Sequence, residues 1–245
     1  RNALHRGMIR EITGFLQSIK HDPGIRILVL GGNGNAFCAG ADLNWMREAA
    51  GLSSTENRQD AMELARCLKE LASLPKITIA RVHGSAYGGA IGLMAACDLA
   101  VITEPCRLAF SEVRLGLIPA TIAPYVMRKA HPGIHELLLT GKEFDGIDAA
   151  TLHLASRAVP EADLDAAVNT LVQELLLAAP EAQLKIKKLI SQFSREIPDD
   201  SMVFQKATWL AETRISPEAR EGLAAFSEKR TPAWVVPHNT DNHGR

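Results

Sequence analysis

Two short runs of small residues are the first feature of this sequence that could do chemistry. Ala39–Ala41 follows one predicted strand, and Gly88–Ala90 follows a second. Small residues let a ligand approach the backbone closely, and the start of a helix presents free N–H groups at the positive end of its dipole. If the two runs converge, one N–H from each could hold a single carbonyl oxygen, as in an oxyanion hole. Tight packing of strands against helices is an equal alternative, because glycine pairs alone are weak evidence of function.

The carboxyl group of Glu112 is the third chemical candidate. It lies between a predicted strand and the apolar run Leu115–Pro119. In apolar surroundings a carboxyl group is either paired with a cation, or its pKa rises from ~4.3 toward the range useful in proton transfer. Arg107 and Arg114 are nearby cations, and taken alone the residue types favour such a pair. The sequence leaves both alternatives open, an ion-pair partner or a general acid/base.

Several other functions are disfavoured by the motifs that the chain lacks. Its glycine runs do not have the spacing of a dinucleotide fingerprint, and it has no Gly-Lys-Ser/Thr of a phosphate-binding loop. Its 245 residues include 27 Lys+Arg and 28 Asp+Glu, so neither charge dominates and we expect no nucleic-acid partner. The four cysteines lack metal-ligand spacing, which predicts reduced, buried thiols and no metal site.

The hydropathy pattern predicts a cytoplasmic protein without a membrane partner. No apolar run reaches the ~18 residues needed to span a bilayer. The chain opens on an amphipathic pattern and not on a signal peptide, although an organelle enzyme without its transit peptide would look the same.

Strands and helices alternate through the first half of the chain, as they must to position the three candidates. Periodicity predicts helices at residues 4–19 and 55–74, and buried strands at 25–30, 77–82, 99–102 and 108–110. From Ile118 onward helical periodicity dominates, with helix starts at Pro180 and Ser216. This order predicts an α/β fold with largely buried strands. We expect a core over residues 1–178, a helical region over 179–236 and a polar tail over 237–245.

Three segments resemble, in order and spacing, the enoyl-CoA hydratase/isomerase (crotonase) family. Phe37–Leu43 and Arg81–Val101 are similar to its oxyanion-hole signatures, and Phe110–Pro119 is similar to its catalytic-glutamate segment. The resemblance implies a crotonase-type ββα spiral core with a C-terminal helical layer used in trimerisation. It also implies a homotrimer or a dimer of trimers, and an opening strand ahead of Arg1. The implied substrate is an acyl-CoA thioester, with no cofactor beyond the coenzyme A that the substrate carries.

The same resemblance assigns roles to individual residues. Ala41 and Gly89 would supply the two backbone N–H groups that hold the thioester oxygen, and Glu112 would be the acid/base. The other glutamate of typical hydratases falls on Gly92, which implies a single-glutamate variant and space for a branched or long acyl group. The alternative for Gly92 is simple packing. The implied substrate- and CoA-binding residues are Phe37 and Leu43 along the channel, Ala39 against the adenine, Gly88, Gly92, and Lys229 as a candidate partner of the coenzyme A phosphates.

A finer resemblance concerns the reaction. Ala39–Met46 and Glu112–Ala120 are similar to the matching runs of bacterial 3-methylglutaconyl-CoA and isohexenylglutaconyl-CoA hydratases, enzymes of leucine and acyclic terpene breakdown. It implies addition of water across the α,β double bond of a branched glutaconyl-type enoyl-CoA. The alternative is an enoyl-CoA isomerase with Glu112 as its single acid/base. An RNA-binding function is disfavoured, because a helix with only Lys185, Lys187 and Lys188 offers few phosphate contacts.

Overall fold

The computed structural model describes residues 1–192 and 200–236. The predicted polar tail at 237–245 therefore lies outside the described residues. The chain divides into two compact units, residues 1–170 and the part from residue 171 onward. The division falls inside α8 (Leu164–Leu177), whereas the boundary expected from the sequence follows residue 178.

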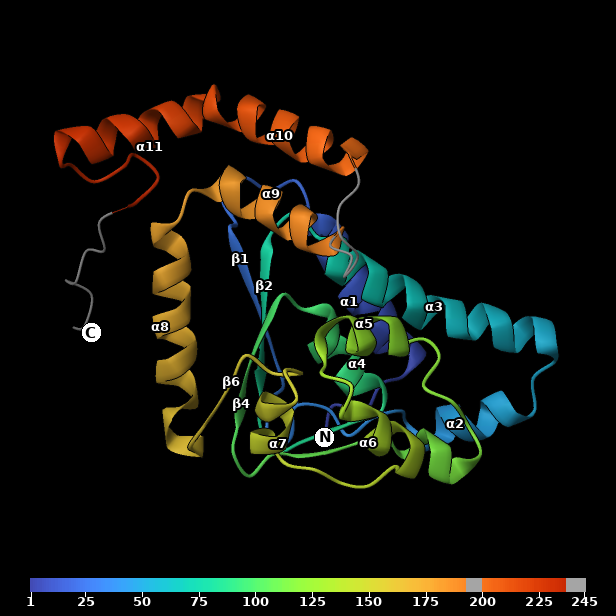
Figure 1. Cartoon of the computed structure of the whole chain (residues 1–245). Coiled ribbons are helices and arrows are strands. Elements are labelled where there is room, and N and C mark those ends of the chain that lie inside the picture. Colours follow the sequence, from blue (N-terminus) through green and yellow to red (C-terminus); the bar gives the residue numbers. More distant parts are fainter. Residues whose placement is uncertain (193–199, 237–245) are drawn as a thin grey trace. The chain divides into compact units, whose positions relative to one another are not determined.

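A four-stranded parallel sheet forms the frame of the first unit (Figure 1). Its strands, in spatial order, are β1 (Ile27–Gly31), β2 (Ile77–Val82), β4 (Leu99–Thr103) and β6 (Arg157–Val159). The register pairs Ile27 with Ile77 and Ile79 with Leu99. The central strands β2 and β4 are buried along nearly their whole length, as expected for parallel strands covered on both faces.

Short extended segments that follow the main strands in the sequence form a second layer. β3 (Ser85–Tyr87) pairs in parallel with β5 (Arg107–Ala109). An isolated bridge joins Cys38 to Ala86, and another joins Leu4 to Ala41. From β1, β2 and β4 in turn, the chain thus runs on through a second-layer segment and then into a helix or helical turn. This repeat is the ββα order that the resemblance implies.

The helix α4 (Gly89–Ala96) lies at the centre of the first unit, where all residues from Ala90 to Ala96 are buried. Its neighbours include α3 (Ser54–Ser73) and α5 (Ala123–Lys129). Fully buried side chains such as Leu68 and Phe110 belong to the same hydrophobic core. The remaining helices of this unit are α1 (Arg6–Ile19), α2 (Leu43–Ala50), α6 (Ile134–Thr140), α7 (Gly146–Thr151) and the 3-10 turns η1 (Ser111–Leu115) and η2 (Glu161–Asp163).

The second unit is helical in its described part. After the end of α8 it contains α9 (Pro180–Ser191), α10 (Asp200–Arg214) and α11 (Pro217–Glu228). Pro180 and Pro217 open their helices, which the sequence predicts from the tolerance of proline in the first turn. Glu218 accepts hydrogen bonds from the amides of Glu181 and Ala182, so the start of α11 caps the start of α9.

The α/β class predicted from the sequence is confirmed, and most predicted elements agree with the structure within a few residues. The sequence pattern did not reveal β3, β6 or α2. β3 and β6 have three residues each, too few to show a period. Among the described residues, no helix combines the length and apolar character needed to cross a bilayer.

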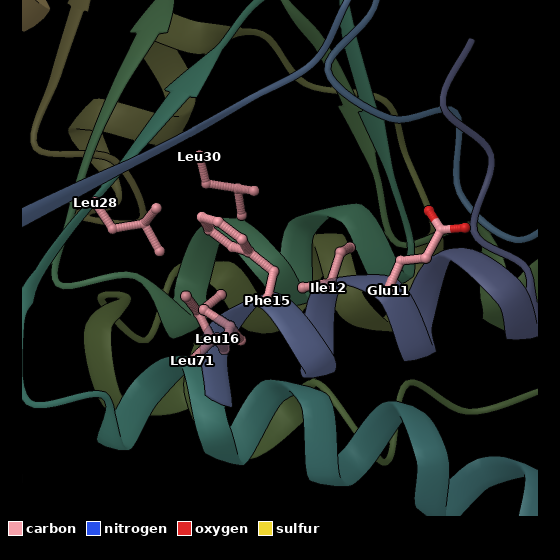
Figure 2. Close-up of a pocket in the computed structure, with 7 residues that line it drawn as sticks. All are labelled: Glu11, Ile12, Phe15, Leu16, Leu28, Leu30 and Leu71. Atoms are coloured by element: carbon pink, nitrogen blue, oxygen red, sulfur yellow. The ribbon is translucent and has the colours of Figure 1, made fainter. Parts of the chain in front are cut away.

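An apolar cavity of about 250 Å³ lies between α1, α3 and β1 (Figure 2). Its lining is aliphatic or aromatic except for Glu11. None of the residues predicted to do chemistry lines this cavity, so the site described next is a different place in the fold.

Candidate active site

The two small-residue runs predicted from the sequence lie side by side. The amide of Cys38 donates to the carbonyl of Ser85 at 3.1 Å, and the amide of Tyr87 donates to the carbonyl of Cys38 at 3.3 Å. These bonds pair Cys38 with Ala86 in parallel. Both segments then continue in the same direction, and Ala41 and Gly89 each lie three residues beyond the paired position.

Leu4 fixes the backbone on both sides of Ala41. Its amide donates to the carbonyl of Gly40 at 2.7 Å, and its carbonyl accepts from the amide of Asp42 at 2.8 Å. The Leu4 side chain also covers Gly89, since a Cβ added there would lie 2.8 Å from Leu4 Cδ1. One buried residue therefore contacts both runs. The sequence shows Leu4 only as an apolar residue on a helical face, so nothing in its type predicts this role.

The backbone amides of Ala41 and Gly89 are the next feature of the site. Within residues 1–192 and 200–236, neither N–H donates a hydrogen bond. Gly89 is the first residue of α4, where backbone amides lack intrahelical acceptors. Ala41 lies between the two bonds made by Leu4, in an exposed position. Two such N–H groups can donate hydrogen bonds to an oxygen that carries negative charge.

Gly40 and Gly88 allow the close approach of the two runs. Gly40 has φ +89°, and a Cβ there would lie 3.0 Å from the carbonyl oxygen of Tyr87. Gly88 has φ +52°, and a Cβ there would lie 2.9 Å from Oε1 of Glu112. Any larger residue would be strained in its backbone and would displace a neighbour. The structure thus brings Glu112 against the turn that carries the free amide of Gly89.

In the part of the chain that the structure describes, neither nearby arginine pairs with Glu112. It lies in η1, and its Oε2 is buried with no hydrogen-bond partner among the described residues. Arg107 pairs with Glu143 at 2.7 Å, and Arg114 donates to the carbonyl of Thr140 at 3.2 Å. Burial raises the pKa of Glu112, because desolvation disfavours the charged carboxylate.

Gly92 needs a correction. The expectation of open space for a branched acyl group is wrong in this structure, because a Cβ at Gly92 would lie 2.3 Å from Cγ2 of Ile122. Ile122 is 1% exposed and fills the space beside the helix. The packing alternative is therefore the one that the structure supports.

The other predicted binding residues are spread over different environments. Phe37 is 4% exposed and packs in the core, so it can shape the site only from beneath. Leu43 is 67% exposed at the start of α2, and Ala39 is half-buried beside Gly40. Lys229 belongs to the second unit, where it is the exposed, left-handed residue after α11. Its predicted contact with coenzyme A phosphates stays a prediction.

The cysteines are structural in character. All four are buried and outside any disulfide, and burial raises the pKa of Cys106 to about 12. In the part of the chain that the structure describes, no group of three or more His, Cys, Asp or Glu residues is placed to hold a metal ion.

Comparison with known proteins identifies the family to which this chain belongs. The model of the enoyl-CoA hydratase/isomerase family matches residues 1–236. The chain belongs to the enoyl-CoA hydratase/isomerase family. An enoyl-CoA hydratase from Shewanella pealeana has 39% identity and a TM-score of 0.90, with 95% of this chain and 87% of that chain covered.

Two further proteins show similar coverage. Pseudomonas aeruginosa AtuE has 30% identity and a TM-score of 0.89, with 96% and 91% of the two chains covered. The enoyl-CoA isomerase/hydratase fer4 of Mycosarcoma maydis is 31% identical over 252 residues, 96% of this chain and 88% of that protein. The fold is the crotonase fold, and the activity is of the enoyl-CoA hydratase/isomerase type on acyl-CoA.

The raised pKa of Glu112 predicts a pH-dependent gain in stability for Glu112→Gln. The folded wild type retains this proton above the ordinary pKa of 4.5, while the unfolded chain releases it, so wild-type stability falls as pH rises through that window. Thermal unfolding of both proteins from about pH 4 to about pH 8 should show the variant's advantage growing with pH and then levelling. Glu174→Gln, at an exposed position on α8, is the control. An advantage that is constant across the range would contradict the raised pKa.

The contact at position 92 predicts coupled effects on stability. Gly92→Ala should lower the free energy of unfolding by about 1–3 kcal/mol, because the new methyl group overlaps Ile122. In a background of Ile122→Ala the same change should cost less, which denaturant unfolding of the double mutant measures. Gly14→Ala in α1 is a matched control, because its added Cβ meets no atom within 4 Å. Strict additivity of the Gly92 and Ile122 changes would show that the two residues do not touch.

Proposed function

We propose that this enzyme hydrates the α,β double bond of a branched, glutaconyl-type enoyl-CoA, such as 3-methylglutaconyl-CoA or its isohexenyl homologue. Such substrates arise in leucine and acyclic terpene breakdown. One observation carries the choice of a proton-transfer reaction at a thioester. It is the buried oxygen of Glu112 against the turn that carries the amide of Gly89, since neither atom has a hydrogen-bond partner among the described residues. The similarity of Ala39–Met46 and Glu112–Ala120 to glutaconyl-type hydratases supports the branched substrate.

The amides of Ala41 and Gly89 are proposed to bind the thioester oxygen. Addition of water to the β-carbon moves electrons toward this oxygen and forms an enolate. Two preset donors stabilise that charge without reorganisation during the reaction, and loss of one such donor typically costs about 3–4 kcal/mol of transition-state stabilisation. Their lack of internal partners supports this role, because no protein bond has to break before the substrate binds.

Glu112 is proposed to carry both protons. As its carboxylate it accepts a proton from water while the water oxygen bonds to the β-carbon. As the resulting carboxylic acid it gives a proton to the α-carbon, so the enolate collapses to the saturated thioester. A carboxyl group with a raised pKa suits both steps, because it is a stronger base when charged and still exchanges protons near neutral pH.

No cofactor enters this scheme beyond the coenzyme A that the substrate carries. Ala39 and Leu43, close in the chain to the Ala41 amide, are proposed to contact the substrate, and Lys229 its phosphates. We also propose a homotrimer or a dimer of trimers as the assembly. The helical second unit and its exposed apolar side chains, such as Phe204 and Phe226, support an assembly role.

Isomerisation is the second candidate, and the packing at Gly92 favours it. Where typical hydratases of the family carry a further glutamate, this chain has Gly92 covered by Ile122. A single carboxyl group is sufficient to take a proton from one carbon of an enoyl-CoA and return it to another.

One experiment separates the two candidates. The enzyme is incubated in ¹⁸O-labelled water with 3-methylglutaconyl-CoA, its isohexenyl homologue or crotonyl-CoA, each in a separate reaction. The masses of the products are measured by mass spectrometry. Hydration adds a water molecule and places ¹⁸O on the β-carbon, whereas isomerisation leaves the mass of the thioester unchanged. The proposal predicts ¹⁸O in the product and the highest kcat/KM for one of the two glutaconyl-type substrates. Preference for crotonyl-CoA would contradict the branched substrate.

Glu112→Gln should lower kcat by at least about 10²-fold, because the amide preserves shape but cannot accept and return a proton. Affinity for the acyl-CoA should change little, which equilibrium binding of the substrate measures. Glu174→Gln should have wild-type activity. A Glu112→Gln protein within tenfold of wild-type kcat would remove Glu112 from the acid/base role.

A further inference from the structure

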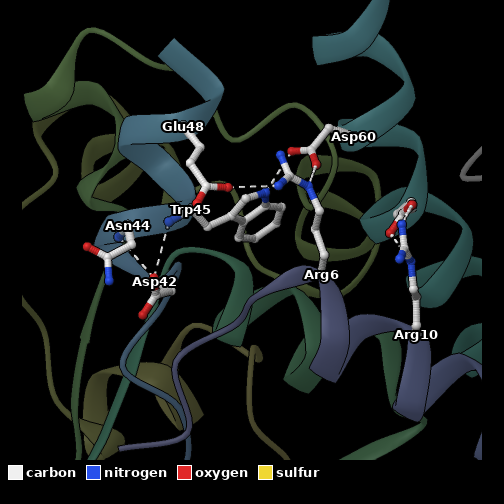
Figure 3. A network of polar contacts seen from close by, with 8 residues as sticks. Arg6, Arg10, Asp42, Asn44, Trp45, Glu48 and Asp60 are labelled. Atoms are coloured by element: carbon white, nitrogen blue, oxygen red, sulfur yellow. Dashed lines mark hydrogen bonds and ion pairs between the residues drawn. The ribbon is translucent and has the colours of Figure 1, made fainter. Parts of the chain in front are cut away.

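A largely buried carboxylate outside the site joins three helices of the first unit (Figure 3). The side chain of Asp60, on α3, is 11% exposed. Its Oδ1 accepts a hydrogen bond from Nε of Arg6 on α1 at 2.5 Å, and its Oδ2 accepts from Nε1 of Trp45 on α2 at 2.8 Å. Arg6 also donates to Glu48 on α2 at 2.9 Å. Asp60 therefore holds α1 and α2 to the same point of α3.

These helices begin next to the residues that frame the Ala41 amide. Arg6 lies two residues after Leu4, whose amide and carbonyl bond the residues on either side of Ala41. On the other side, Asp42 caps α2 by accepting hydrogen bonds from the amides of Asn44 and Trp45. Both chain segments at Ala41 thus lead within one helical turn to a donor that binds Asp60.

The helix that carries Asp60 also reaches the second amide. Leu64 lies one turn after Asp60 on α3, and a Cβ added at Gly89 would lie 3.7 Å from Leu64 Cδ2. One face of α3 is consequently a common reference for the Ala41 segment and the start of α4. Charge-assisted hydrogen bonds are stricter in geometry than apolar contacts, which suits them to fix a direction.

We infer that Asp60 is a positioning residue that sets the direction of the Ala41 N–H toward the thioester oxygen. The inference rests on the proposed role of the Ala41 and Gly89 amides. Donors in such a site must be held within about 0.5 Å of the productive geometry. Loss of the Asp60 bonds would let α1 and α2 shift relative to each other, and the Ala41 amide would turn with them.

The test combines kinetics with the infrared spectrum of a bound thioester. Asp60→Asn keeps the shape of the side chain but leaves only one acceptor oxygen for Arg6 and Trp45. We expect kcat to fall about tenfold or more while KM changes much less, because the lost interaction acts in the transition state. The infrared measurement uses the Glu112→Gln background, which stops turnover. Bound crotonyl-CoA is labelled with ¹³C at the thioester carbonyl, and its carbonyl stretch moves toward low frequency when the amides bind the oxygen. This shift should be smaller in Glu112→Gln/Asp60→Asn than in Glu112→Gln with Asp60 intact.

A matched control exists on the same helices. Arg10 and Glu63 form another α1–α3 ion pair, at 2.6 Å, that does not involve α2. Glu63→Gln should leave both the kcat and the carbonyl shift as in the wild type. Should Asp60→Asn fail to fold, Trp45→Phe removes the indole N–H donor while it keeps an aromatic ring, and it should reduce the carbonyl shift in the same direction.

Three results would overturn the inference. A folded Asp60→Asn protein, or in its place Trp45→Phe, with an undiminished carbonyl shift and kcat would give this cluster a purely stabilising role. An equal loss in Glu63→Gln would show that any loosening of α1 against α3 has the same effect. Absence of a carbonyl shift when Asp60 is intact would instead refute the proposed role of the two amides, and the Asp60 inference would fall with it.

Discussion

The site depends on one backbone constraint. The segment that follows β1 pairs with β3. Two parallel segments bonded at Cys38 and Ala86 run on in step, and each delivers one amide three residues later. Leu4 bonds the first segment and covers the second. Because backbone groups make these bonds, the relative placement of the amides depends on register and on small side chains. The main sheet contributes by fixing where each segment starts.

Function and stability oppose each other at this site. Among the described residues, two backbone donors and the buried Oε2 of Glu112 lack protein partners, and an unsatisfied buried oxygen lowers the stability of a fold. Gly88 must also adopt a left-handed backbone so that Glu112 can lie against it. The surrounding structure tolerates these groups because α4 is completely enclosed by apolar neighbours from Ala90 to Ala96. A well-packed core thus supports a site whose polar groups are held ready for a ligand.

The sequence predicted what depends on local patterns. Apolar runs located β1, β2 and β4, and proline and capping residues located α9 and α11. Glu112 and the two small-residue runs were found from residue type, and the family resemblance connected them. Side-chain packing across the fold was beyond such patterns. Nothing near Gly92 in the chain indicates that Ile122, thirty residues later, fills the adjoining space.

The same limit applies to Leu4 and Asp60. Their roles depend on backbone bonds and ion pairs between distant segments, and an apolar residue or a helical aspartate is common in any sequence. β3 and β6 were missed because three residues carry no measurable period, and pairing with neighbouring strands is what defines them. Long-range contacts therefore account for most of what the sequence alone could not supply.

The central claim is that one thioester oxygen binds both backbone amides while Glu112 faces the reacting carbons. A crystal structure of the Glu112→Gln protein with a bound enoyl-CoA tests it most directly. The account predicts a thioester oxygen ~2.7–3.1 Å from the nitrogens of both Ala41 and Gly89, with the side chain at position 112 beside the α- and β-carbons. A thioester oxygen bound elsewhere, or bound by only one of these amides, would contradict it.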